Sequence, residues 1–173
     1  MQSSDYWKAV LVDRENFLER ILKFLRTSGV RYCIVGGTGV NAYTYPVVTE
    51  DLDIAVAAAE INTLQAALGR EFKVRRFAHS INVSAPESKL QVQIQTDPRY
   101  FDFVERAEIR DVMDFQLPVA QLEDLLKGKI WAFSDTTRRK SKRQKDLADI
   151  ARIIEVAREL REQLPDELLS KLV

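Results

Sequence analysis

Two β-rich runs follow each other closely, and this constrains the fold more than any other feature. Residues 30–35 read Val-Arg-Tyr-Cys-Ile-Val and suit a strand buried on both faces. The segment Gly36-Gly37-Thr38-Gly39 breaks this strand, and Pro46 ends the short helix expected after it. Polar and apolar residues alternate at the start of residues 51–57, which predicts a second strand. A parallel return needs a connection of about a dozen residues or more. The predicted helix is too short for that, so the two strands should not form a parallel βαβ unit.

The remaining pattern predicts an α+β chain with a short, mostly antiparallel sheet. Apolar residues at helical spacing, with Gly29 as the stop, predict a first helix that Ser3, Ser4 and Asp5 could cap. Further along the chain we expect a helix over 58–69, an antiparallel meander over 72–77, 81–84 and 90–95, a helical stretch over 100–106, and one strand with a loop over 109–119. We therefore expect one domain over residues 1–173, with an N-terminal helix to about 29, a sheet core with its cleft over 30–119, and C-terminal helices over 120–173.

Composition narrows the class of protein. The chain has 173 residues, 26 basic and 26 acidic side chains and 46% hydrophobic residues, which suits one packed globular domain. Its single cysteine, Cys33, forms no internal disulfide and excludes a zinc site built of cysteines. Zero formal net charge gives no overall attraction to nucleic acid or an anionic membrane. No apolar run approaches the roughly 20 residues that span a bilayer, and the N-terminus lacks the core of a signal peptide. We expect a cytoplasmic protein without a membrane partner.

The residues that indicate chemistry lie around the break between the two strands. Asp51 and Asp53 are two apart on a strand, so they point to the same face and can share one divalent cation. Such oxygen ligands are those that Mg²⁺ prefers. Gly36 and Gly37 lead into a helix, where the backbone can approach a phosphate closely. A phosphate cradle one short helix before a metal pair is what a nucleoside triphosphate site needs.

These motifs resemble the nucleotidyltransferase superfamily, of the DNA polymerase β palm type. Within it the chain is most similar to the AbiEii-like toxin nucleotidyltransferases of toxin–antitoxin and phage-defence systems. The resemblance covers most of the chain from about Arg31 to Glu155. It rests on Val35-Gly36-Gly37-Thr38, Thr49-x-Asp51-Leu52-Asp53, Leu117-Pro118-Val119 with Leu122-Glu123-Asp124-Leu125 and Lys129, and Arg143-x-Lys145-Asp146-Leu147-x-Asp149.

The resemblance implies a nucleotidyltransferase fold and a reaction. An acceptor hydroxyl attacks the α-phosphate of a nucleoside triphosphate with the help of Mg²⁺. The acceptor could be RNA, a protein or a small molecule, and a protein partner encoded as an antitoxin is implied. Carried onto this sequence, the family's catalytic residues are Asp51, Asp53 and Lys129, with Asp51 and Asp53 as metal ligands, and its nucleotide-binding residues are Gly36, Gly37, Thr38, Thr49, Gln93 and Lys145. Lys129 and Lys145 would neutralise phosphate charge as pyrophosphate leaves.

Two residues depart from the family pattern. Gln93 stands where a third carboxylate is expected, and an amide is a weaker ligand for Mg²⁺ and no base. Val47 stands where many AbiEii-like chains carry an arginine. The alternative function is therefore a catalytically impaired relative that binds a nucleotide or a protein.

Plainer interpretations remain open for several motifs. Gly37-x-Gly39-x-x-Ala42 after a strand also fits a dinucleotide-binding pattern, with Glu60 as its acidic residue, although the predicted topology argues against it. Lys145 and Asp149 could form an ordinary ion pair one helical turn apart. The basic run over 138–145 could be a solvated face or a patch for phosphates. Tyr100 and its neighbouring aromatic residues could pack or stack on a base.

Overall fold

The computed structural model describes residues 16–172, and the predicted caps Ser3, Ser4 and Asp5 lie outside this range. The elements in chain order are α2 (Phe17–Ser28), β1 (Tyr32–Val35), α3 (Gly36–Asn41), β2 (Asp51–Val56), η1 (Ala58–Glu60), α4 (Ile61–Leu68), β3 (Lys73–Arg76), β4 (Ser80–Ser84), β5 (Gln91–Gln95), η2 (Pro98–Phe103), β6 (Glu108–Val112), β7 (Phe115–Val119), α5 (Leu122–Ser134), α6 (Lys140–Val156), η3 (Arg158–Gln163) and α7 (Asp166–Leu169). Gly29 has a φ of 70° and ends α2 as the sequence predicts.

One sheet of seven strands organises the described residues, in the order β3-β4-β5-β2-β1-β7-β6. The neighbours β1 and β2 are antiparallel, so the strands around the glycine break form no βαβ unit and the dinucleotide-binding pattern has no structural support. The meander β3-β4-β5 is antiparallel, and β5 then lies parallel to β2. This topology places β2, which carries Asp51 and Asp53, in the interior of the sheet.

The segment over 109–119 differs from its prediction of one strand and a loop. It forms a hairpin of β6 and β7 that pairs antiparallel, and β7 then pairs parallel with β1. Met113 and Asp114 make the turn with φ of 51° and 68°. Hairpin turns of this kind usually contain Asn or Gly, which tolerate positive φ. Methionine gives no such signal, so Asp114 is the only residue of the pair that hints at this turn.

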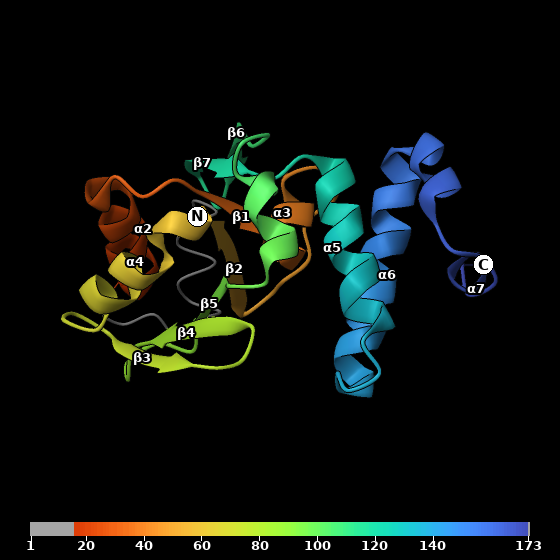
Figure 1. The fold of residues 1–173 in the computed structure, drawn as a ribbon. Helices are drawn as coiled ribbons and strands as arrows, with labels where there is room; N and C mark the ends of the chain where they lie inside the picture. Colours follow the sequence, from red (N-terminus) through yellow and green to blue (C-terminus); the bar gives the residue numbers. More distant parts are fainter. Residues whose placement is uncertain (1–15, 173) are drawn as a thin grey trace.

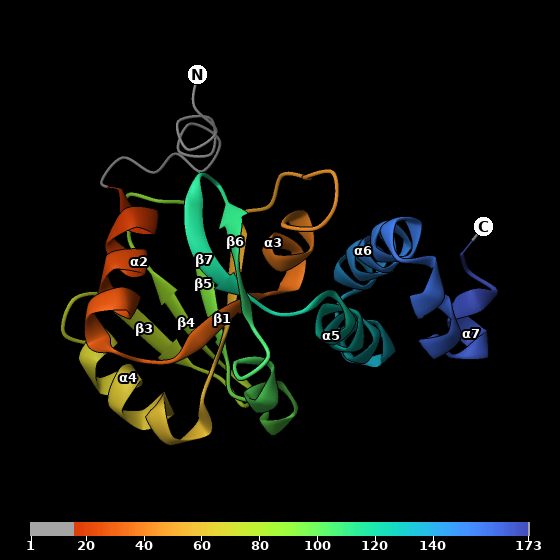
Figure 2. The same ribbon diagram turned by 90° about the horizontal axis from the view of Figure 1, so that it is seen from above.

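Helices cover both faces of the sheet. Figures 1 and 2 show α2 and α4 on one side, and α3 on the other with α5 and α6 beyond it. Gly39 allows α3 to pack closely, because a Cβ there would lie 2.7 Å from Cδ2 of Leu125 in α5. Across the described residues, no helix combines the length and apolar character needed to cross a membrane.

Candidate active site

The centre of the site is a row of polar residues across three neighbouring strands. Asp53 of β2 is paired in register with Gln93 of β5, and Gln93 in turn with Asn82 of β4. Residues paired in this way project from the same face of a sheet. Asp51 lies two residues earlier on that face, opposite Gln91. The structure thus brings Gln93 directly beside Asp53, so the position of the expected third carboxylate is filled by an amide.

The carboxylate of Asp53 is held against the first residue of α3. Gly36 has a φ of 65°, and a Cβ there would lie 2.9 Å from Cβ and Cγ of Asp53 and would overlap its Oδ2. Only glycine combines this backbone conformation with such a close approach. The glycine break predicted from the sequence therefore makes room for the acidic side chain of the neighbouring strand.

The negative charge of the Asp53 carboxylate is not fully balanced by its surroundings. Its Oδ1 is buried without a hydrogen-bond partner among the described residues. Burial raises the pKa of the Asp53 carboxyl to about 6, and the negative charge of Asp51 adds to this effect, while Lys129, Arg138 and Lys142 oppose it. The cations nearby are thus too few or too distant to balance the buried carboxylate in the protein alone.

Asp51 is fixed by both of its backbone groups and by a lysine. The Thr38 hydroxyl donates a 2.9 Å hydrogen bond to the carbonyl oxygen of Asp51, and the Asp51 N–H donates to Oγ1 of Thr49 at 3.2 Å. Its carboxylate pairs with Nζ of Lys142 from α6 at 2.7 Å. Thr38 and Thr49 therefore orient the strand end that presents Asp51, and Lys142 lies where a cation bound by Asp51 would lie.

Lys129 of α5 is buried in a network of charges. Its Nζ lies 2.8 Å from Oδ2 of Asp149 and 3.2 Å from Oδ1 of Asp146, both on α6. Burial alone would lower the pKa of its ammonium, but these two carboxylates outweigh it and the pKa is raised. Lys129 therefore stays charged, joins α5 to α6, and acts on Asp53 through its field.

Arg138, just before α6, and Arg152, within α6, complete this network. The Arg138 guanidinium donates to Asp146 at 2.7 Å, and the Arg152 guanidinium lies 2.7 Å from Asp149. Asp149 is thus paired with Lys129 and Arg152, whereas the sequence suggested a pair with Lys145. Arg152 also donates to the Asn41 side chain at 2.6 Å, which ties α6 to the end of α3.

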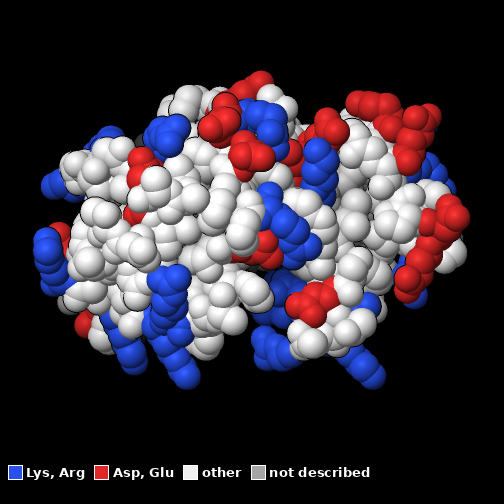
Figure 3. Space-filling model, viewed as in Figure 1, with Lys and Arg blue, Asp and Glu red and all other residues white. Residues whose placement is uncertain are grey.

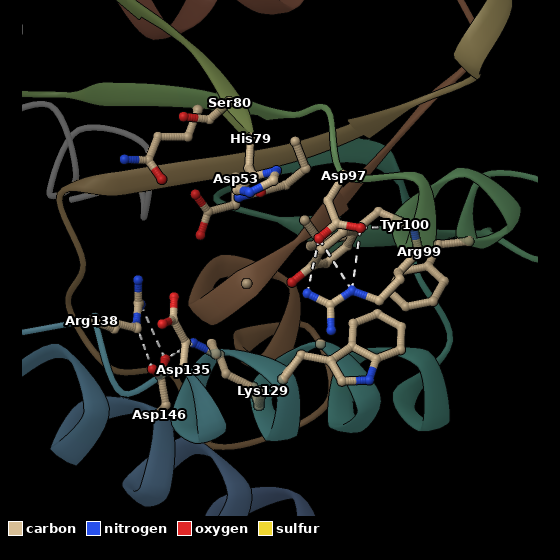
Figure 4. Close-up of a pocket in the computed structure, with 18 of the residues that line it drawn as sticks. Asp53, His79, Ser80, Asp97, Arg99, Tyr100, Lys129, Asp135, Arg138 and Asp146 are labelled. Atoms are coloured by element: carbon tan, nitrogen blue, oxygen red, sulfur yellow. Dashed lines mark hydrogen bonds and ion pairs between the residues drawn. The ribbon is translucent and has the colours of Figure 1, made fainter. Parts of the chain in front are cut away.

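Two adjoining hollows meet at Asp53. The larger, of about 1000 Å³, opens between the polar row of the sheet and α5. Figure 4 shows Asp97, Arg99 and Tyr100 toward one end of it and Arg138 and Asp146 toward the other. The smaller, of about 60 Å³, lies between α3 and α6. Its lining includes Gly37, the two aspartates Asp51 and Asp53, and Lys145 with five further charged residues of α5 and α6. Of the residues predicted around a triphosphate, Gly37, Thr49 and Lys145 line this smaller hollow, Gly36 and Gln93 line the larger one, and Thr38 lines neither.

The basic run over 138–145 divides between these hollows and the surface. Arg138 and Lys142 turn inward to carboxylates, whereas Arg139 and Lys140 are exposed. Figure 3 shows basic side chains along the lower part of this face, where the α5–α6 junction lies in Figure 1. The run is therefore in part a wall of the site and in part a solvated face.

The residues present fit one divalent cation. The orphaned Oδ1 of Asp53, the closeness of Asp51 and the room left by Gly36 provide hard oxygen ligands and an uncompensated negative charge. Within residues 16–172 no group of three or more histidine, cysteine, aspartate or glutamate side chains gathers to hold a metal. The cradle therefore offers two carboxylates, without the third that the resemblance implies.

Sequence reasoning did not include Lys142, Asp146, Asp149 or Arg152 among the site residues, although Asp146 and Asp149 belong to a motif that carries the resemblance. Their spacing of four, three and three residues places them on one face of a helix. Two acids flanked by two cations along one face are the signal that could have identified them. What it could not reveal is that this face lies against β2 and α3.

The family model that describes the nucleotidyl transferase AbiEii toxin of type IV toxin–antitoxin systems matches residues 24–172. Among curated proteins, no sequence matches this chain significantly.

Three solved structures resemble the fold. The structure of ANT(2")-Ia in complex with adenylyl-2"-tobramycin gives a TM-score of 0.62 at 11% identity, over 90% of this chain and 97% of that one. The lincosamide antibiotic adenylyltransferase LnuA gives 0.54 at 18% identity, over 80% of this chain and 97% of that one. An antigenic nucleotidyltransferase-like protein from Paracoccidioides brasiliensis gives 0.53 at 17% identity, over 90% and 78%. At such low identities these structures show a shared fold.

Proposed function

This chain belongs to the AbiEii family of nucleotidyl transferase toxins, and from that premise we propose that it transfers a nucleoside monophosphate from a nucleoside triphosphate to an acceptor hydroxyl. The observation that carries the proposal is Asp53, whose buried and unpartnered carboxylate oxygen lies beside Asp51 at the junction of two hollows. A scaffold has no physical need for such a group, because an uncompensated buried charge destabilises the fold.

Asp51 and Asp53 would hold Mg²⁺. The ion would supply charge neutralisation and polarisation of the phosphate at which transfer occurs. Lys142 would leave Asp51 when the ion binds, and its ammonium is then free to pair with phosphate oxygens. Lys145 lines the same hollow and would bind the departing pyrophosphate.

The remaining residues keep these groups in place. Gly36 and Gly37 let the chain approach the triphosphate without side-chain atoms in between. Thr38 and Thr49 hold the backbone of Asp51. Lys129, already bound to Asp146 and Asp149, would act on the phosphates through its charge and on the site through the position of α6.

Family membership indicates the general classes of acceptor and partner, but not their identity. RNA, protein and small-molecule hydroxyls remain candidates, because a fold does not select among them. A type IV toxin–antitoxin context would pair this chain with an antitoxin encoded alongside it.

A second candidate function is nucleotide binding without turnover. Gln93 supports it, since an amide lies in register beside Asp53 where a carboxylate would ligate a second ion and accept the acceptor proton. In this candidate the same nucleotide binds with Mg²⁺, but no pyrophosphate is released.

Calorimetric titration of each nucleoside triphosphate, with and without Mg²⁺, tests the site. We expect metal-dependent binding in the wild type and its loss in the double variant Asp51→Asn plus Asp53→Asn. Lys140→Met is the matched control, because Lys140 is an exposed cation of α6 that lines neither hollow at Asp53. Binding that survives in the double variant would refute the assigned site.

Pyrophosphate release then separates the two candidate functions. Incubation with the triphosphate that binds and with total RNA, protein extract or sugar-containing small molecules should release pyrophosphate with one acceptor class. Binding with no release in any mixture would favour the non-catalytic candidate.

A further inference from the structure

Two planar groups pack against the indole of Trp131 at one end of the larger hollow. The ring of Phe103 is buried and stacks near the indole of Trp131, with centroids 5.8 Å apart and an interplanar angle of 16°. The guanidinium carbon of Arg99 lies over the same indole at 4.7 Å from its centroid. We call Phe103, Trp131 and Arg99 together the Arg99 platform.

The Arg99 guanidinium is fixed in this position by Asp97. Its Nε lies 3.2 and 3.1 Å from the two carboxylate oxygens, and Nη2 donates to Oδ2 at 2.8 Å. These bonds raise the pKa of Arg99 and lower that of Asp97, so both groups stay ionised. An arginine fixed by a bidentate partner loses little additional freedom when a ligand arrives.

Part of the Arg99 platform is accessible to a ligand. The Arg99 side chain is 53% exposed, although Asp97 and Trp131 engage it, and Arg99 and Trp131 line the larger hollow. Figure 4 shows Arg99 beside Asp97 and Tyr100, toward the end of the hollow that faces away from Arg138 and Asp146. Tyr100 packs edge-on against the indole with centroids 5.5 Å apart. Burial raises the pKa of its hydroxyl, and the negative charge of Asp53 adds to this effect.

We propose that the Arg99 platform is the subsite for a nucleobase, which stacks on the guanidinium of Arg99. Guanidinium planes are stacking surfaces for bases. The indole of Trp131 lies against this guanidinium, and Phe103 packs on Trp131. The sheet side of the larger hollow carries Asn82, Gln93 and Gln95, whose amides offer hydrogen-bond donors and acceptors to the edge of a base.

The position of the Arg99 platform along the larger hollow supports a nucleobase as its ligand. Triphosphate charge belongs with the cations at the α3–α6 hollow, on the other side of Asp53. The group bonded to the reacting phosphate, or the acceptor that attacks it, must then extend into the larger hollow. The Arg99 platform receives the base of the donor nucleotide or that of an acceptor nucleotide, and the test below distinguishes the two.

This inference rests on the proposed function, because the donor nucleotide is taken from it. The experiment therefore compares ligands with and without a base. Adenosine, guanosine, cytidine and uridine triphosphates and inorganic tripolyphosphate are titrated with Mg²⁺ into wild type and Arg99→Lys. Lysine keeps the charge and a partner for Asp97 but has no planar face. We expect Arg99→Lys to weaken nucleotide binding by about tenfold and to leave tripolyphosphate unchanged.

An acceptor base is tested by a trinucleotide with a free 3′-hydroxyl, titrated into the same proteins. If Arg99→Lys weakens only the trinucleotide, the subsite belongs to the acceptor. Arg161→Lys in η3 is the matched control, because Arg161 is exposed and lines neither hollow. Equal affinities of wild type and Arg99→Lys for every nucleotide would overturn the proposal.

Fluorescence gives a second, independent readout. The chain has two tryptophans, Trp7 and Trp131, so Trp7→Phe leaves Trp131 as the only one. Its emission should change with a nucleotide that stacks on Arg99 and stay constant with tripolyphosphate. If wild type binds neither triphosphates nor tripolyphosphate, the proposed function fails, while the trinucleotide titration still decides whether the Arg99 platform binds a base. An emission that stays constant on saturation with every nucleotide would refute the Arg99 platform.

Discussion

Replacing Asp53 by asparagine should stabilise the metal-free protein at neutral pH, although it removes a residue of the site. The folded protein holds the Asp53 proton more tightly than the unfolded chain, with a pKa of about 6 against an ordinary value of 3.8. Ionisation is therefore disfavoured in the folded state. Wild type loses stability as the pH rises from about 4 to about 6, and the full penalty remains above that range.

The size of this loss of stability follows from the same pKa shift of Asp53. One pKa unit corresponds to about 1.36 kcal/mol, so a change from 3.8 to about 6 corresponds to about 3 kcal/mol. This is an upper bound, because Asp53 is only half-buried as a residue and keeps some surface in the hollow, although its Oδ1 is fully covered. For a chain of this length it would raise Tm by up to about 6–12 °C.

Urea denaturation of wild type and Asp53→Asn at several pH values, with a chelator present, measures the effect. The difference in unfolding free energy should approach zero near pH 4 and reach its plateau above about pH 6. Other carboxyl groups titrate in both proteins and largely cancel in the difference. Added Mg²⁺ should then stabilise wild type and leave Asp53→Asn nearly unchanged. A variant no more stable than wild type at pH 7.5, or a difference that does not vary with pH, would refute the reasoning.

Three further substitutions probe neighbouring groups. Lys142→Met removes the counter-ion of Asp51. Calorimetry should then show tighter binding of Mg²⁺ alone, by about tenfold, and weaker binding of nucleotide with Mg²⁺. Unchanged affinities would mean that the ion pair is only a surface contact. Gln93→Asp adds a third carboxylate beside Asp53 and should strengthen Mg²⁺ binding, with weaker binding as the contrary result. Gly36→Ala forces a Cβ onto the Asp53 carboxylate at positive φ and should lower stability by about 1–3 kcal/mol in thermal unfolding, whereas a neutral effect would show that this approach is relaxed.

Local patterns determined most of the fold. The break at Gly36 and the interval before Asp51 were enough to exclude a parallel βαβ unit, because connection length restricts strand direction directly. Apolar spacing likewise predicted the C-terminal helices. The hairpin over 108–119 was missed, because its turn gives positive φ to Met113, a residue type that rarely adopts it, and Asp114 alone is a weak turn signal.

The sequence by itself also supplied the acids of the site, since two aspartates two apart on a strand necessarily share a face. Motif position predicted Gln93 as a residue of the site, and the β2–β5 register puts that residue beside Asp53. Only the tertiary structure decided which cations meet these acids. Lys142 reaches Asp51 across 91 residues of chain, and Lys129 joins α6. Such pairings depend on how α6 packs against α5 and α3, and helical periodicity shows which face of a helix is charged but not which element that face meets.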